Sequence, residues 1–143
     1  MDFEFSQDQQ LLARTAQDFV SKRSPVARAR KLRDDATGYE PSVWKEMADL
    51  GWLGIPFSEE VGGTGGTFVD LALILEQLGS ELMPEPFVPS VVLAGTVLAH
   101  GASPAQQTRF LQPMIAGETT PALAYAERAH RFDIESVCST PPT

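Results

Sequence analysis

Residues 51–79, GWLGIPFSEEVGGTGGTFVDLALILEQLG, constrain the fold of this chain more than any other stretch. A short extended run leads into a loop with four glycines in five residues, and an apolar segment follows. Thr67 and Asp70 have the spacing of a capping box, which predicts a helix over residues 68–78 that Gly79 ends. Only three residues of that helix are polar. No face is left for solvent, so we expect this helix to lie inside a bundle.

The glycine loop, residues 62–66, has two possible roles. A phosphate-binding loop needs either the spacing of a dinucleotide fingerprint or a Gly-Lys-Ser/Thr ending, and this loop has neither. Pro56 also interrupts the strand that should precede such a motif. The sequence therefore favours a tight loop that leads into the next helix.

The charge balance excludes some classes of partner. The chain of 143 residues carries 11 Lys and Arg against 19 Asp and Glu, a formal net charge of −8. Proteins that bind nucleic acid or anionic membranes need a basic face, so we expect neither kind of partner. No run is long and apolar enough to span a membrane, and the first ten residues lack the pattern of a signal or transit peptide. We expect a cytoplasmic protein.

Cysteine and histidine are scarce. Cys138 is the only cysteine, so no internal disulfide can form. His100 and His130 are far apart in sequence and supply no zinc-type ligand set. We expect no metal site.

Further helices are predicted on both sides of the central stretch. Ser6 and Gln9 form a capping box before an amphipathic segment, and proline at a first helical position opens two others at Pro41 and Pro104. Residues 26–33 hold four basic side chains, which could face a phosphate but are more typical of a solvated short helix. A nearly all-apolar helix begins at residue 89 or 90 and ends at residue 101, and the last helix, bent at Pro113, ends at Gly117.

The apolar helix over residues 90–101 has two unusual features. Three prolines in six residues precede it and impose an extended connection. Gly95 lies inside it and costs about 1 kcal/mol of helix propensity relative to alanine. Its presence suggests the close approach of another backbone or of a ligand.

The pattern changes after Gly117. Residues 120–126 are predicted to form a strand, and a second short strand is predicted near residues 134–138. Two strands cannot make an independent sheet. We therefore expect a helical domain over residues 1–117, followed by the incomplete start of a β domain over residues 118–143.

This chain resembles the amino-terminal region of the acyl-CoA dehydrogenase family. The resemblance rests on residues 51–79, which end in Glu-Gln-Leu-Gly, and on three further segments in the same order: FSQDQQLLARTAQDFV, PSVWKEMADLGWLGI and SPAQQTRFLQPMIAGE. It implies an all-α helical bundle with the first strand or two of the family's middle β domain. Related subunits in that family form homo- or hetero-oligomers.

The resemblance also implies a reaction, the α,β-dehydrogenation of an acyl-CoA thioester. A glutamate removes the α-proton, FAD accepts the β-hydride, and electron-transfer flavoprotein takes up the electrons. The family's glutamate lies on carboxy-terminal helices that this chain lacks. No catalytic residue is therefore assigned here, and the isolated chain is expected to be inactive.

The resemblance assigns two sets of binding residues. Main-chain groups of Ala124, Tyr125 and Ala126 correspond to the family's flavin-facing strand. In the family, the acyl tail would lie against the apolar helix over residues 90–101 and the proline-rich connection before it. This gives Phe87, Val91 and Gly95 as acyl-pocket candidates. Each of these three residues could equally belong to the core of the bundle.

Departures from the family pattern follow the flavin-facing strand. Glu127 and Asp133 match the pattern, but Ala126 has no hydroxyl, Arg128 replaces a proline and Phe132 replaces a serine. Two alternatives stay open for this reason. The chain could be a non-catalytic subunit that completes the acyl pocket of a flavin-bearing relative, or a fold relative that oxidises a substrate other than a CoA ester.

Overall fold

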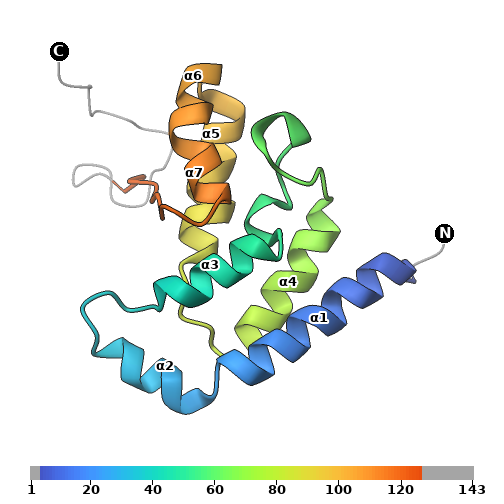
Figure 1. The fold of residues 1–143 in the computed structure, drawn as a ribbon, viewed down its shortest axis with the longest axis vertical. Coiled ribbons are helices and arrows are strands. Elements are labelled where there is room, and N and C mark those ends of the chain that lie inside the picture. Colours follow the sequence, from blue (N-terminus) through green and yellow to red (C-terminus); the bar gives the residue numbers. More distant parts are fainter. Residues whose placement is uncertain (1–3, 127–143) are drawn as a thin grey trace.

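The computed structural model describes residues 4–126, and every regular element in that range is helical (Figure 1). The amino-terminal part contains α1 (Gln7–Arg23), α2 (Val26–Arg33), α3 (Pro41–Asp49), η1 (Trp52–Gly54), η2 (Glu59–Val61) and α4 (Phe68–Ser80). The carboxy-terminal part contains η3 (Val88–Gly95), α5 (Thr96–Gly101), α6 (Pro104–Gln106), η4 (Gln107–Leu111) and α7 (Gln112–Ile115). The predicted helical bundle is confirmed.

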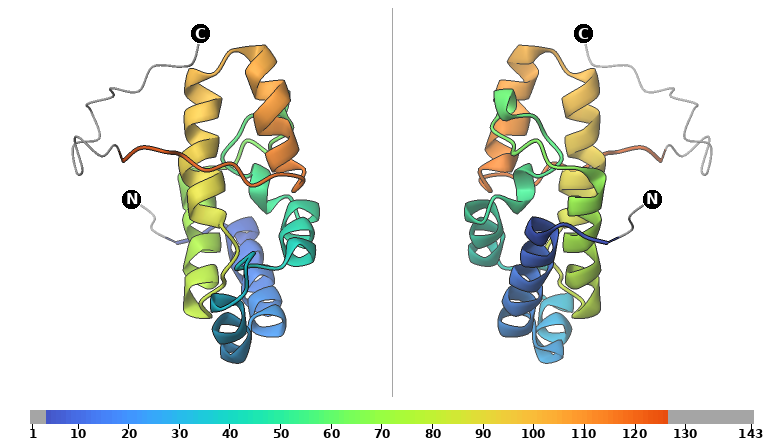
Figure 2. Two further views of the ribbon diagram at one scale, coloured as in Figure 1. Left: turned by 90° about the vertical axis from the view of Figure 1, so that its left-hand side faces the viewer. Right: turned by 90° about the vertical axis from the view of Figure 1, so that its right-hand side faces the viewer.

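The helices form two groups. Helix α1 packs along α4, while η3 runs straight into α5 and pairs with the continuous α6–η4–α7 helix as a helical hairpin (Figure 2). Both η3 and η4 are π-helices. Pro113 is the second residue of α7, two positions after the last residue of η4. The wider π turn relieves the clash that a proline ring makes with a preceding carbonyl.

Capping explains where three of these helices begin. Each predicted capping pair forms both of its reciprocal bonds: Ser6 with Gln9, Thr67 with Asp70, and Ser103 with Gln106. These bonds satisfy backbone N–H groups that have no partner within the helix.

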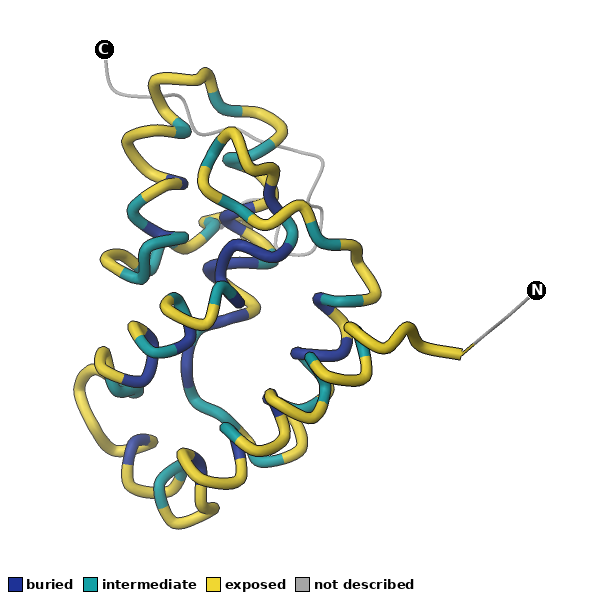
Figure 3. The backbone as a smooth tube through the Cα atoms, turned by 45° about the vertical axis from the view of Figure 1, so that its right-hand side comes forward, coloured by how far each residue is buried: buried dark blue, intermediate teal, exposed yellow. Residues whose placement is uncertain are grey.

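The core lies where the two groups of helices meet, and buried positions gather there (Figure 3). Trp44 and Trp52 are both almost fully buried, as expected of core residues. Phe19 packs edge-on against Trp52, with 5.0 Å between ring centroids. The largest other fully buried side chains are Phe87, Met47, Leu53, Ile74, Leu111 and Met114.

Helix α4 differs from its prediction in two ways. One side faces solvent, because Phe68 is 76% exposed and Val69 and Ala72 are also exposed. Gly79 does not end the helix, which continues to Ser80. The stop comes from Leu82, whose φ of 54° is left-handed. The N–H groups of Leu82 and the following Met83 then bond carbonyls of the last helical turn, as in a Schellman motif.

The strand predicted over residues 120–126 does not form. These residues carry no helix or strand, because no other described segment offers an edge to pair with. The segment instead leaves α7 and crosses the η3–α5 helix (Figure 2). The second predicted strand, near residues 134–138, lies outside the described residues. No helix in the described range is long and apolar enough to cross a membrane.

Candidate functional site

The N–H groups of the glycine loop donate to carbonyls of the preceding residues 54–58. Four consecutive N–H groups are used in this way, with donor–acceptor distances of 2.8 to 3.0 Å: Gly63 to Ser58, Thr64 to Gly54, Gly65 to Phe57, and Gly66 to Ile55. A phosphate cradle needs free N–H groups that point outward. The loop is therefore a structural lead into α4, as its sequence favours.

An apolar groove opens between α4 and the start of η3, and we call it the α4–η3 groove. Its cavity volume is about 300 Å³. It is lined by Leu75, Leu78, Gly79, Leu82, Met83, Glu85, Phe87, Val88 and Pro89. Glu85 is its only charged residue. A groove of this composition suits an apolar chain better than a polar ligand.

The three predicted acyl-pocket residues do not share one surface. Phe87 lines the α4–η3 groove, although its side chain is largely buried. Val91 and Gly95 face the interior. A Cβ on Gly95 would lie 2.5 Å from Cζ of Phe57, so the close approach comes from an aromatic side chain and not from the backbone or ligand that the sequence suggested.

The side of this helix that solvent reaches carries other residues. Val88, Leu93 and Val97 are exposed, and they are four or five positions apart, so they lie on one side of a helix with π and α turns. We call them the outer face of η3–α5. Sequence reasoning missed them because the segment is apolar all round, and its periodicity cannot tell an outer face from an inner one.

The predicted flavin segment is accessible. Ala124, Tyr125 and Ala126 are all exposed, and their backbone groups form no hydrogen bond within residues 4–126. The segment that carries them passes beside η3–α5 (Figure 2).

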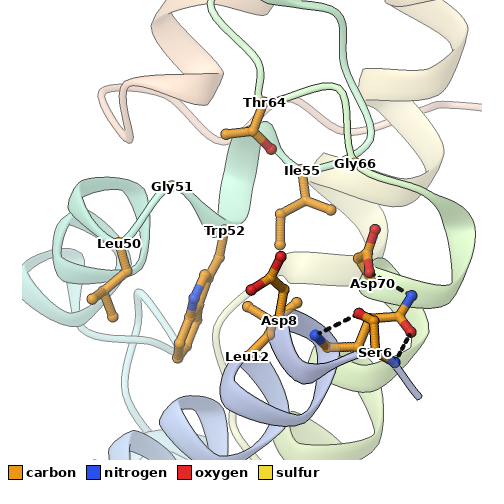
Figure 4. A pocket seen from close by; sticks show the side chains of 11 residues that line it. Ser6, Asp8, Leu12, Leu50, Gly51, Trp52, Ile55, Thr64, Gly66 and Asp70 are labelled. Carbon is orange, nitrogen blue, oxygen red and sulfur yellow. Dashed lines mark hydrogen bonds between the residues drawn. The ribbon is translucent and has the colours of Figure 1, made fainter. Parts of the chain in front are cut away.

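A second cleft, of about 460 Å³, lies between the start of α1 and the residues around η1 (Figure 4). Asp70 lies in its wall and accepts hydrogen bonds from the Thr67 N–H and hydroxyl at 2.7 Å, and from Gln9 at 3.0 Å. The bond from the Thr67 backbone is the main cause that lowers the pKa of Asp70. This carboxylate is occupied in joining α1 to α4.

One of the basic residues of α2 is not solvated as predicted. The Arg28 side chain is only 9% exposed, and it contacts Glu85 in the wall of the α4–η3 groove. Burial alone would lower the pKa of Arg28, but hydrogen bonds and charges from Glu85 and Glu40 outweigh it and raise the pKa. The two partners are 57 positions apart in sequence, so no local pattern marks the pair.

Comparison with known proteins identifies the group to which these features belong. Residues 6–118 match the family model described as acyl-CoA dehydrogenase, N-terminal domain. Acyl-CoA dehydrogenase IpdE2 of Mycolicibacterium smegmatis is 34% identical over 96 residues, which are 66% of this chain and 29% of that protein. Acyl-CoA dehydrogenase IpdE2 of Mycobacterium tuberculosis is 30% identical over 71% of this chain and 32% of that protein.

Solved structures agree with the sequence matches. The ChsE4-ChsE5 complex of Mycobacterium tuberculosis contains a chain with a TM-score of 0.78 and 26% identity, over 88% of this chain and 35% of that one. Butyryl-CoA dehydrogenase of Megasphaera elsdenii has a TM-score of 0.75 and 26% identity, over 94% of this chain and 36% of that one. This chain spans about a third of the length of the relatives it matches.

Proposed function

Because the chain belongs to the acyl-CoA dehydrogenase family, we propose that it forms the helical wall of an acyl-CoA site used in flavin-dependent α,β-dehydrogenation. The observation that supports this most is the exposed outer face of η3–α5. Val88, Leu93 and Val97 leave apolar surface open on a helix whose other side is core. A bound acyl chain would run from the α4–η3 groove, which Val88 also lines, over that surface. Each buried CH₂ group would contribute about 0.8 kcal/mol.

The flavin segment fits a cofactor held by main-chain contacts. The exposed backbone groups of Ala124, Tyr125 and Ala126 have no partner within residues 4–126 and can bond the polar edge of a flavin ring. FAD would accept the hydride from the β-carbon, and electron-transfer flavoprotein would then receive the electrons. These three residues would orient the ring beside η3–α5.

The groove does not supply a base. Glu85 is its only acid, and Arg28 holds both of its oxygens. A general base needs a carboxylate that is free to accept a proton from the substrate. This arrangement supports the expectation that the base belongs to a part of the enzyme beyond this chain, and that the chain alone does not turn over a thioester.

The binding claim is tested with dodecanoyl-CoA, with CoA alone as the reference ligand, by titration calorimetry on the purified chain. We expect dodecanoyl-CoA to bind more tightly than CoA. Val97→Asp should weaken that binding at least tenfold, since it places a charge against the acyl chain. Val69→Asp on α4 is the matched control, because Val69 is 43% exposed against 50% for Val97. Equal affinities for both variants would contradict the proposal.

A second candidate function is that of an accessory subunit in a heteromer. Ala126 has no hydroxyl to offer a flavin, and a solved relative at 26% identity is a ChsE4-ChsE5 complex. Such a subunit would complete the acyl pocket of a related, flavin-bearing chain. Co-purification with a longer homologous chain that carries all of the flavin would favour this candidate. A purified chain that stays monodisperse alone would count against it.

A further inference from the structure

A buried ion pair holds one wall of the α4–η3 groove. The Glu85 side chain is completely buried, and both of its oxygens accept bonds from the Arg28 guanidinium, Oε2 at 3.2 Å and Oε1 at 2.5 Å. Arg28 also donates Nε–H to Glu40 at 3.2 Å. The Glu40 N–H in turn donates to Glu85 at 3.4 Å. The pair therefore joins α2, the start of α3 and the groove.

The groove wall is held at a second point. Ser24, which is fully buried, donates its hydroxyl to the Glu81 carbonyl at 3.2 Å. Glu81 and Glu85 lie in the connection over residues 81–87, between α4 and η3. Next to Glu81, Leu82 has the left-handed backbone. Both ends of the connection are thus tied to the turn and helix that follow α1.

Stability does not explain why this contact is ionic. A buried ion pair loses the hydration of both charges, and apolar residues of similar volume often serve stability as well or better. A bidentate Arg–carboxylate pair instead fixes the distance and the angle between two segments. The geometry therefore indicates a role in placing the connection.

We infer that Arg28 is a positioning residue, which acts through Glu85 to hold residues 81–87 in the conformation that keeps the α4–η3 groove open to an acyl chain. This inference rests on the proposed function for the ligand, but not for the placement. Phe87 and Val88 come two and three positions after Glu85 and line the groove. A shift of the connection would carry both into it.

Amide hydrogen exchange, measured by mass spectrometry on the full chain, tests the placement. Arg28→Met/Glu85→Met replaces the pair by apolar side chains, and Lys45→Met/Asp49→Met does the same to an exposed pair on α3. We expect amides of residues 81–90 to exchange at least tenfold faster in the first variant, with α1 unchanged. The second variant should match the wild type. Unchanged exchange over residues 81–90 in the first variant would overturn the inference.

A conservative variant decides the matter if the double variant does not fold. Arg28→Lys keeps the charge but loses the two-pronged contact. We expect exchange over residues 81–90 to rise at least threefold, and an unchanged rate would overturn the inference. Dodecanoyl-CoA affinity should fall in parallel, at least tenfold in the double variant. If dodecanoyl-CoA does not bind the wild type, the proposed function is wrong. The exchange rates would still test whether Arg28 positions residues 81–87.

Discussion

The ring of Phe57 occupies the space beside Gly95 that a side chain would need. A Cβ at position 95 would lie 2.5 Å from Cζ of Phe57 and 3.2 Å from Cε of Met114, and both neighbours are buried. This contact joins the segment before the glycine loop to the hairpin of η3–α5 with α6–α7. Helix propensity alone would favour alanine at this position, so packing decides the residue.

We expect Gly95→Ala to lower the free energy of unfolding by about 1–3 kcal/mol, the usual cost of an overpacked core. Urea unfolding followed by circular dichroism measures the change. Gly79→Ala is the matched control, because Gly79 lies in α4 with nothing within 4 Å of its added Cβ. The control should raise stability by about 0.5–1 kcal/mol. Equal effects would show that Phe57 can move aside.

Gly63→Ala should be more damaging. An added Cβ would lie 2.1 Å from the carbonyl oxygen of Phe57, and a backbone atom cannot rotate away. We expect a loss of about 3 kcal/mol or more in the same assay. Gly65→Ala meets no atom within 4 Å but has a φ of 66°, so it should cost only about 1–2 kcal/mol. A reversed order would contradict the loop geometry.

Leu82→Gly should stabilise the domain. Leu82 is exposed and has a left-handed φ of 54°, which costs a residue with a side chain about 1–2 kcal/mol. Glycine is the usual residue at this position after a helix. We expect a rise of about 1 kcal/mol in the free energy of unfolding. A fall would indicate that the Leu82 side chain contributes more to the groove than its exposure suggests.

The sequence predicts those structural features that depend on residues close together along the chain. The box that begins α4 could be read directly, because Thr67 and Asp70 are three positions apart. Arg28 and Glu85 could not be paired, because their contact depends on how α2 packs against a distant connection. Local rules also assume that a neighbouring strand is present to pair with. The prediction of a strand over residues 120–126 was wrong for this reason. These residues suit a strand, but the described chain has no edge to receive it.

The candidate site shows the same contrast between features set by local sequence and features set by tertiary packing. The family resemblance gives Val91 and Gly95 as acyl-pocket candidates because they lie on the helix along which the family's acyl tail runs, yet the fold turns both inward. Val97 on that same helix faces outward. When every position is apolar, only tertiary packing decides which residues a ligand can reach.

Asp70 should make the free energy of unfolding depend on pH in the acidic range. Its pKa is lowered in the folded state, so its contribution is complete above the unfolded value of about 3.8 and is lost as pH falls through the folded value. We expect Asp70→Asn to cost about 1 kcal/mol at neutral pH, the usual effect of a helix cap. That difference should shrink as pH falls below the unfolded value and through the lowered folded value. Asp18→Asn, on the exposed side of α1, is the control, and a difference that does not change with pH would contradict the assignment.

The central claim is that this chain supplies a binding wall but neither the base nor a complete flavin site. The most direct measurement combines intact mass, the visible absorbance spectrum and thioester-dependent dye reduction on the same purified sample. For the 15.5 kDa chain alone, we expect no flavin bands and no dye reduction. Both should appear only when a longer related chain is present. Dye reduction by the 15.5 kDa chain alone would contradict the claim.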